Sequence, residues 1–223
     1  MKTAFAILLT SLTVLMLGCG KSDETADVPP PAVPEGEIWP LEIGNTWAFL
    51  ATEFDSTGAV RKTYASSFDV LRTSLAKDKE WFDLRVTRDG KPVGHGYLLR
   101  NETDGLWHSG GSPSIQPYMV AKYPASAGET FYWGGDTTSL YSVLSTDTSI
   151  TVPAGTYRCL MYRVTYSTSG TKPFVFTLTD YYSPGVGWVK SEKYRRLESG
   201  ESYLATLTEL QSLTMNRTAA PDS

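Results

Sequence analysis

The sequence after residue 44 alternates repeatedly between apolar and polar side chains, and this period of two constrains the fold more than any other feature. Successive side chains of a strand point to opposite faces, so such runs indicate strands with one face in a core. Three sets of apolar residues share a face in this way: Tyr64, Phe68 and Val70; Phe82, Leu84 and Val86; and Phe174, Phe176 and Leu178. We therefore expect Phe176 to face the core and its neighbour Thr177 to face the opposite side.

Turn sequences rich in Gly, Pro, Asn, Asp and Ser separate the alternating runs. They include STG at 56–58, RDGKP at 88–92, NETDG at 101–105, TSGTKP at 168–173, SPG at 183–185 and ESGE at 198–201. The pattern predicts strands over residues 45–54, 59–73, 80–88, 93–100, 105–109, 129–133, 139–151, 156–167, 173–182, 187–196 and 202–214.

Consecutive strands joined by short turns form an antiparallel meander. Apart from a helical turn expected near 115–122, no long stretch after Cys19 has the 3.6-residue period of a helix. The chain also holds 13 Tyr, 8 Phe and 6 Trp, which suit pleated, half-buried surfaces. Flat open sheets of about ten strands are rare. The predicted fold class is therefore all-β, an antiparallel meander of about ten strands curled into a half-open barrel.

The N-terminal sequence resembles a bacterial lipoprotein signal. Residues 4–17 carry no charge and are largely apolar. This run is shorter than the roughly 20 residues of a membrane span and fits the apolar region of an export signal. It ends in MLGC at 16–19, which resembles a lipobox, although Leu17 stands where Ala or Ser is commoner. The resemblance implies a signal peptide over 1–18 and acyl chains such as palmitate on Cys19. The alternative is an incidental cysteine in an ordinary signal or anchor helix.

The remaining chain divides into three parts. Residues 19–37 combine the lipidated N-terminus with a Pro-rich tether, since four prolines and five acidic residues leave no apolar periodicity. Residues 38–214 are long enough for one β-meander domain with its own core. Residues 215–223 are expected to be a disordered tail. The anchor at Cys19 predicts a cell-envelope protein held on a membrane. If the cell is Gram-negative, Gly20 after that cysteine is typical of outer-membrane lipoproteins facing the periplasm.

Charge and cysteine content exclude some functions. The whole chain has a net charge of −4, and removal of residues 1–18 takes away Lys2, which leaves 19 basic and 24 acidic residues, a balance of −5. Nucleic-acid binding requires a basic surface, so no nucleic-acid partner is expected. With Cys19 lipidated, Cys159 has no partner for a disulfide. Its apolar neighbours predict a buried, inert thiol.

One motif occurs twice. WPLEIGNTW at 39–47 and YPASAGETF at 123–131 share the pattern aromatic-Pro-x₃-Gly-x-Thr-aromatic, and VPAGTY at 152–157 is a shorter version. Proline fixes φ, glycine permits the turn, and the Thr-aromatic pair begins a strand. We favour independent use of one strand-opening turn, and a true two-fold repeat is the alternative.

Three motifs together resemble a set of bacterial lipoproteins of unassigned activity. They are WPLEIGNTW at 39–47, TVPAGTYRC at 151–159 and YYSPGVGWVKSE at 181–192. More loosely, the domain is similar to the half-open β-barrels of periplasmic lipid and lipoprotein carriers. The resemblance supplies no catalytic residues, and its motif residues are turn builders; Pro184-Gly185, for example, suits the centre of a type II turn.

Candidate chemistry is sparse. His95 and His108 lie on strands that would be neighbours, but they lack the spacing of a known metal motif, so no metal or cofactor is expected. Asp180 is the best isolated carboxylate on a strand, and a hydrogen-bonded structural role is the simpler interpretation. There is no GxSxG nucleophile motif, and GSPS at 111–114 and WGGD at 133–136 lack the context for phosphate binding. These absences predict that the protein is not an enzyme.

Two functional hypotheses follow. The first is a binding module whose concave, aromatic-rich face holds an apolar ligand or a partner segment. The second is a structural or assembly lipoprotein that presents a sheet edge or loops to another envelope protein. An enclosed cavity lined by aromatic residues favours the first hypothesis, whereas a filled core with an exposed apolar patch favours the second. The sequence does not identify the ligand-binding residues.

Overall fold

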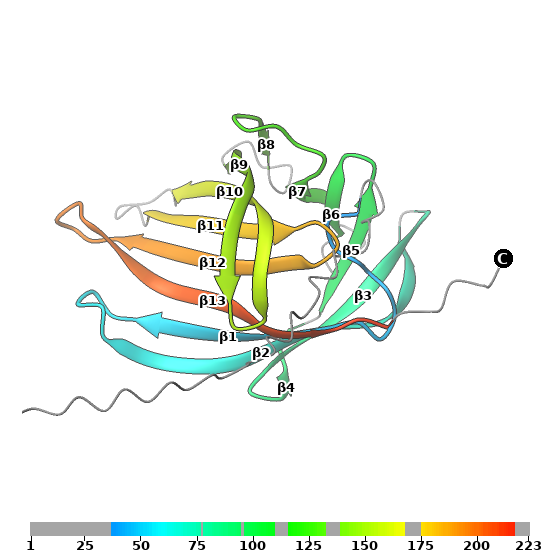
Figure 1. Ribbon diagram of the computed structural model, residues 1–223, viewed down its shortest axis with the longest axis horizontal. Coiled ribbons are helices and arrows are strands. Elements are labelled where there is room, and N and C mark those ends of the chain that lie inside the picture. The colour runs from blue at the N-terminus through cyan, green and yellow to red at the C-terminus, as the bar shows by residue number, and fades with distance from the viewer. Residues whose placement is uncertain are drawn as a thin grey trace, which may run out of the picture. The chain divides into compact units, whose positions relative to one another are not determined.

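Thirteen antiparallel strands form one continuous sheet in the computed structural model (Figure 1). The structure describes residues 37–76, 78–94, 96–109, 116–132, 139–167 and 175–216, apart from the side chains of residues 167 and 175. The strands are β1 (Thr46–Phe54), β2 (Val60–Ala76), β3 (Lys79–Arg88), β4 (Lys91–Pro92), β5 (Tyr97–Glu102), β6 (Gly105–Ser109), β7 (Tyr118–Lys122), β8 (Thr130–Tyr132), β9 (Leu140–Val152), β10 (Gly155–Ser167), β11 (Val175–Ser183), β12 (Gly187–Arg196) and β13 (Ser202–Thr214). The all-β prediction is confirmed.

The sheet curls into a nearly closed barrel with one open seam. Its strand order is β7-β6-β5-β3-β2-β1-β13-β12-β11-β10-β9-β8, with β4 paired to β3. The chain therefore makes two meanders, and β13 returns to pair with β1. No ladder joins β7 to β8 within the described residues, so these two strands border the seam.

One predicted element is wrong. The sequence predicts a helical turn near 115–122, but residues Tyr118–Lys122 form β7 and pair with β6. Four of the five β7 residues are half-buried, so the strand lacks the alternation that reveals the others. Two-residue β4 was also not predicted, for the same lack of a pattern.

The repeated motif makes the same structure twice. The Gly44 amide donates to Val70 O at 2.9 Å, and the Val70 amide donates to Asn45 O at 3.0 Å. In the second copy the Gly128 amide donates to Val143 O at 2.8 Å, and the Val143 amide donates to Glu129 O at 2.9 Å. Gly44 and Gly128 both have positive φ, 94° and 89°. The two motifs thus open the two meanders in equivalent places, which favours the two-fold repeat.

This repeat accounts for the position of the seam. If β1 is equivalent to β8 and β7 to β13, the paired β1–β13 contact corresponds to the missing β8–β7 contact. β1 has nine residues and β8 has three. A three-residue strand offers few ladder hydrogen bonds, so the second junction stays open.

The core lies inside the barrel, and the segment before β1 contributes to it. The largest fully buried side chains include Trp47, Trp81, Tyr162, Phe49, Ile38 and Leu84. Two polar contacts fix the entering segment: Asn101 Nδ2 donates to Trp39 O at 2.6 Å, and Trp47 Nε1 donates to Val186 O at 2.7 Å. Trp39 is thereby held between the two meanders, where it also borders the cavity described below.

The C-terminal boundary lies slightly beyond the predicted one. Met215 packs against the core, and the Asn216 amide donates to Asn45 Oδ1 at 2.6 Å. These two residues belong to the folded domain rather than to the expected tail. Residues 217–223, the signal peptide, Cys19 and most of the tether lie outside the described residues. Within the described part of the chain, no helix is long and apolar enough to span a membrane.

Candidate functional site

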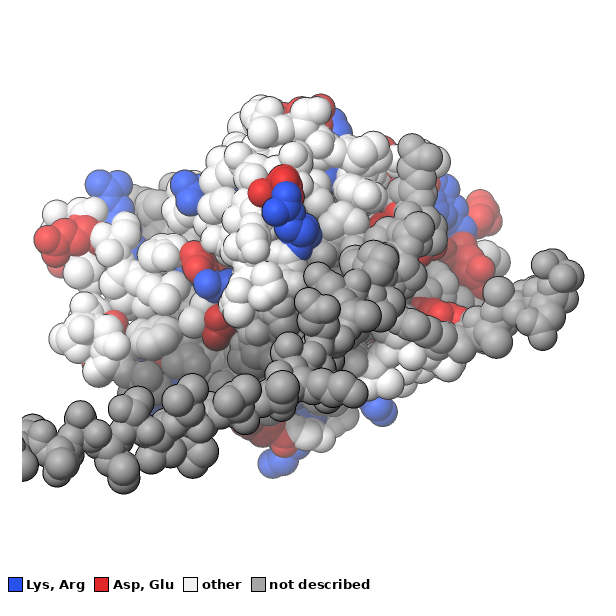
Figure 2. Space-filling view, in the orientation of Figure 1, with Lys and Arg blue, Asp and Glu red and all other residues white. Residues whose placement is uncertain are grey.

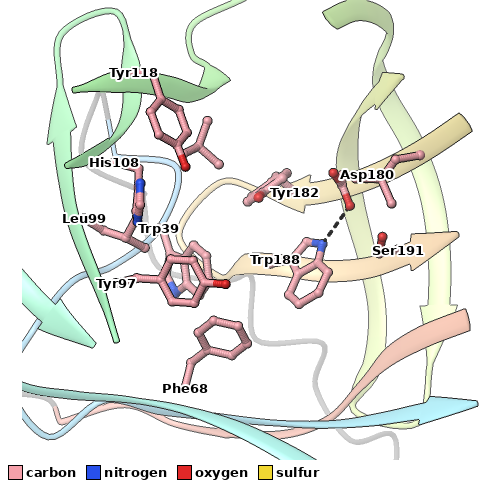
Figure 3. Close-up of a pocket in the computed structure, with 12 residues that line it drawn as sticks. Trp39, Phe68, Tyr97, Leu99, His108, Tyr118, Asp180, Tyr182, Trp188 and Ser191 are labelled. Atoms are coloured by element: carbon pink, nitrogen blue, oxygen red, sulfur yellow. Dashed lines mark hydrogen bonds between the residues drawn. The ribbon is translucent and has the colours of Figure 1, made fainter. Parts of the chain in front are cut away.

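A cavity of about 310 Å³ lies inside the barrel, between the two meanders (Figure 3). β5, β6 and β7 of the first meander provide Tyr97, Leu99, His108, Tyr118 and Val120, and β11 and β12 of the second provide Leu178, Asp180, Tyr182, Trp188 and Ser191. Trp39 and Phe68 complete the lining. Most of these side chains are apolar or aromatic, which is typical of small-molecule sites.

Strand register brings these residues together. Leu99 of β5 lies opposite His108 of β6, and His108 lies opposite Tyr118 of β7. On the other side, Asp180 lies opposite Ser191, and Tyr182 lies opposite Trp188. Residues opposite one another in an antiparallel ladder share a face, so both groups point into the barrel.

The aromatic rings form a continuous lining. The rings of Tyr118 and His108 are 4.8 Å apart between centroids, and those of His108 and Tyr97 are 5.2 Å apart. Phe68 continues the series, at 5.9 Å from both Tyr97 and Trp188. Such separations are usual for favourable aromatic pairs. The wall therefore holds its shape through its own contacts and needs no ligand to order it.

His108 is the unusual polar residue of the cavity. Its side chain is buried, with 7% of the residue exposed, and neither ring nitrogen has a hydrogen-bond partner among the described residues. Burial lowers the pKa of His108 to about 4, so the ring is neutral at pH 7. A buried polar group without a partner is costly, and a ligand that bonds to it would remove that cost.

Asp180 provides a second polar group, and it is satisfied. Its Oδ1 accepts from Trp188 Nε1 at 3.2 Å, the dashed line in Figure 3, and its carboxylate also accepts from Ser191. Burial raises the pKa of Asp180 to about 6, and these two hydrogen bonds oppose the rise. The hydrogen-bonded role predicted for Asp180 is thus what the structure shows, with the addition that the residue borders a cavity.

The other candidates from the sequence have different outcomes. His95, GSPS at 111–114 and most of WGGD at 133–136 lie outside the described residues, so a His95–His108 pair stays untested. No group of three metal-ligating side chains occurs in the described ranges. Cys159 is a free, fully buried thiol whose pKa is raised to about 12 by burial, as its apolar neighbours predict.

Sequence reasoning did not find most of the cavity residues. Tyr97, Tyr182 and Trp188 carry no motif that separates a cavity wall from ordinary core, and Tyr118 lay in the segment predicted as a helical turn. Only the shared face of Phe68 and the face of Leu178 were predicted, and both residues border the cavity.

Comparisons with known proteins support the fold. The sequence profile of a DUF3108-like family matches residues 143–205, which is less than half of the chain. A crystal structure from Bacteroides fragilis, whose name describes an exported protein with a YmcC-like fold, is similar with a TM-score of 0.55 and 15% identity. That match covers 81% of this chain and 100% of the other. A structure from Parabacteroides distasonis, whose name describes a lipoprotein, has a TM-score of 0.53 and 15% identity over 80% and 99% of the two chains. No curated protein matches the sequence.

Proposed function

We propose that this protein is a cell-envelope lipoprotein, anchored through Cys19, whose barrel binds an apolar ligand in the cavity between the two meanders. The observation that carries the proposal is the aromatic cavity itself, about 310 Å³ with the unpartnered His108 in its wall. Interiors without a binding role are packed to nearly crystalline density. A cavity of this size therefore represents lost packing, and a ligand would restore it.

Membrane attachment is the second part of the proposal. It is supported by the MLGC sequence at 16–19 and by the Pro-rich stretch that follows. The two structural neighbours, one described as exported and one as a lipoprotein, are consistent with it.

A cavity-filling substitution tests ligand binding. Leu178 borders the cavity, whereas Thr177 lies on the other face of the same strand, where its hydroxyl is 3.3 Å from that of Thr165. We expect the chain from residue 19 onward, with Cys19→Ser, to retain bacterial lipid in native mass spectrometry. Leu178→Trp should abolish retention and Thr177→Trp should preserve it, with both variants keeping a β-type circular dichroism spectrum. Equal lipid retention by both variants would contradict the proposal.

The seam supports the alternative, an assembly lipoprotein that presents a sheet edge to another envelope protein. β7 and β8 each keep one edge without a strand partner in the described residues, and free edges recruit strands from other chains. The cavity favours the binding module, because an assembly role requires an exposed surface and gives no reason for interior space.

A further inference from the structure

The cavity continues into a second hollow on the concave face of the sheet. This hollow has a volume of about 200 Å³ and shares Phe68, Tyr97 and Trp188 with the cavity. Its far side is lined by Tyr64 and Arg88. A ligand lying in the cavity therefore has a continuous path past three aromatic rings to a positively charged residue.

The strand register places further cations on the same face. Lys62 follows two residues before Tyr64 on β2, and Arg88 lies opposite Ser66, another lining residue of the hollow. On β12, Lys193 lies opposite Leu178, which borders the cavity, and Arg195 lies opposite Phe176. The path from the cavity is thus flanked by cations on the β2–β3 side and on the β11–β12 side.

Three of these cations rest on aromatic rings instead of carboxylates. The Arg88 guanidinium carbon lies 4.3 Å and Lys62 Nζ 5.3 Å from the centre of the Tyr64 ring. Lys193 Nζ lies 4.3 Å from the centre of the Phe176 ring. None of these three forms a salt bridge with a described residue, although Glu53 lies opposite Lys62 in the register.

The cations of the outer face differ. Arg72 pairs with Asp83 at 3.1 Å, Arg85 with Asp69 at 3.4 Å, and Lys190 with Glu192 at 2.9 Å. In Figure 2, positive and negative side chains are mixed over the visible surface, with no large area of one sign. Positive charge without nearby negative charge is therefore a local property of the concave face.

We propose that the ligand of this cavity is a single-chain amphiphile with an anionic head group. Its apolar chain lies in the cavity, and its carboxylate or phosphate lies outside, against Lys62, Arg88 and Lys193. This inference rests on the proposed function and adds the chemical class of the ligand. Charge complementarity selects the head group, because an anion supplies the partner that these cations lack.

The size of the cavity restricts the apolar part. Ligand sites range from about 300 to 1,000 Å³, and this cavity lies at the lower end of that range. One extended acyl chain fits such a space, whereas a lipid with several chains requires a larger one.

Calorimetric titration of four probes with a twelve-carbon chain tests the proposal. The probes are dodecanoate, dodecyl phosphate, 1-dodecanol and dodecyltrimethylammonium, each below its micelle concentration, added to the Cys19→Ser chain from residue 19 onward. We expect the two anions to bind about tenfold or more tightly than the alcohol and the cation. Their affinity should fall as salt shortens the Debye length from about 10 Å at 0.1 M to about 3 Å at 1 M. The ratio of dodecanoate to dodecyl phosphate affinity identifies which anionic head is preferred.

Two matched triple variants locate the head group. The inner variant is Lys62→Gln, Arg88→Gln and Lys193→Gln, and the outer variant is Arg72→Gln, Arg85→Gln and Lys190→Gln, on the same three strands. The inner variant should lose the preference for anions and keep its affinity for 1-dodecanol, while the outer variant should bind like the parent chain. Equal binding of dodecanoate and 1-dodecanol by the parent would overturn this inference and leave the proposed function standing. Failure of all four probes to bind would count against the proposed function itself.

Discussion

At the scale of single residues, His108 and Asp180 place two titratable groups in one apolar cavity with opposite pKa shifts. Burial disfavours the charged form of each, so it lowers the pKa of the histidine and raises that of the aspartate. Asp180 compensates with hydrogen bonds from Trp188 and Ser191, whereas His108 has none among the described residues. Their effects on stability therefore run in opposite directions with pH.

Single substitutions should reveal these two effects. The pKa of Asp180 rises from 3.8 to about 6 on folding, so its stabilising contribution is complete below pH 4 and lost as pH rises through 6. The pKa of His108 falls from 6.5 to about 4, so its contribution is complete above pH 6.5 and lost as pH falls through 4. Each effect amounts to about 3 kcal/mol. Relative to the parent, Asp180→Asn should thus gain stability as pH rises from 4 to 7, and His108→Gln should lose it.

Urea denaturation of both variants at several pH values measures this difference. All other carboxylates contribute equally to the two variants, so they cancel in the comparison. Parallel pH profiles for Asp180→Asn and His108→Gln would show that the two groups are not buried in the folded protein as the structure places them.

At the scale of elements, a strand's position in the barrel decides how much each of its residues matters. Phe49 on β1 is 1% exposed and belongs to the core. Phe176 on β11 faces the same interior but is only half-buried, stacked on Tyr166 at 4.6 Å near the open end of its strand. The alternating pattern identifies the face of each residue correctly, but not its depth.

Truncation of these two phenylalanines should therefore have unequal costs. Phe49→Ala removes a fully buried ring and is expected to lower the free energy of unfolding by about 3–5 kcal/mol. Phe176→Ala should cost about half as much or less, because solvent already reaches part of the ring. Thr177→Ala, on the opposite face of β11, should stay within about 1 kcal/mol. The midpoints of urea denaturation rank the three variants, and a Phe176→Ala cost equal to that of Phe49→Ala would place the core boundary incorrectly.

At the scale of the whole molecule, two equivalent meanders enclose the cavity, and the proposed lipid anchor determines where the barrel works. Trp39 lies only a short distance in sequence from the tether and borders the cavity. Membrane attachment through acyl chains stabilises the bound state by about 0.8 kcal/mol per buried CH₂, so two or three chains hold a protein firmly.

Loss of the anchoring thiol should release the protein. In a bacterium, Cys19→Ser is expected to appear as an uncleaved precursor or in the soluble fraction, whereas the parent chain is cleaved before Cys19 and found with the membranes. Cys159→Ser is the control, since that thiol is buried in the barrel. Immunoblotting of fractions and mass spectrometry of the mature N-terminus give the result. Processing and fractionation of Cys19→Ser like those of the parent would refute the lipobox interpretation.

The sequence by itself determined the all-β class, the approximate course of eleven strands and the turns between them, because alternation and turn chemistry are local properties. It also showed the repeated motif at 39–47 and 123–131, but not that both copies form the same hydrogen bonds to Val70 and Val143. β7 escaped detection because its half-buried residues alternate too weakly, and only its pairing with β6 defines it as a strand.

Tertiary structure alone decided the cavity, the seam and the basic character of the concave face. Tyr118, His108 and Trp188 are ordinary strand residues until the curl of the sheet brings the two meanders to face each other. Lys62 and Lys193 are likewise distant in sequence, and only the register shows that both share the face that borders the cavity. The curvature that leaves space between these residues is a sum of twists and bulges over thirteen strands, and no local run of sequence encodes it.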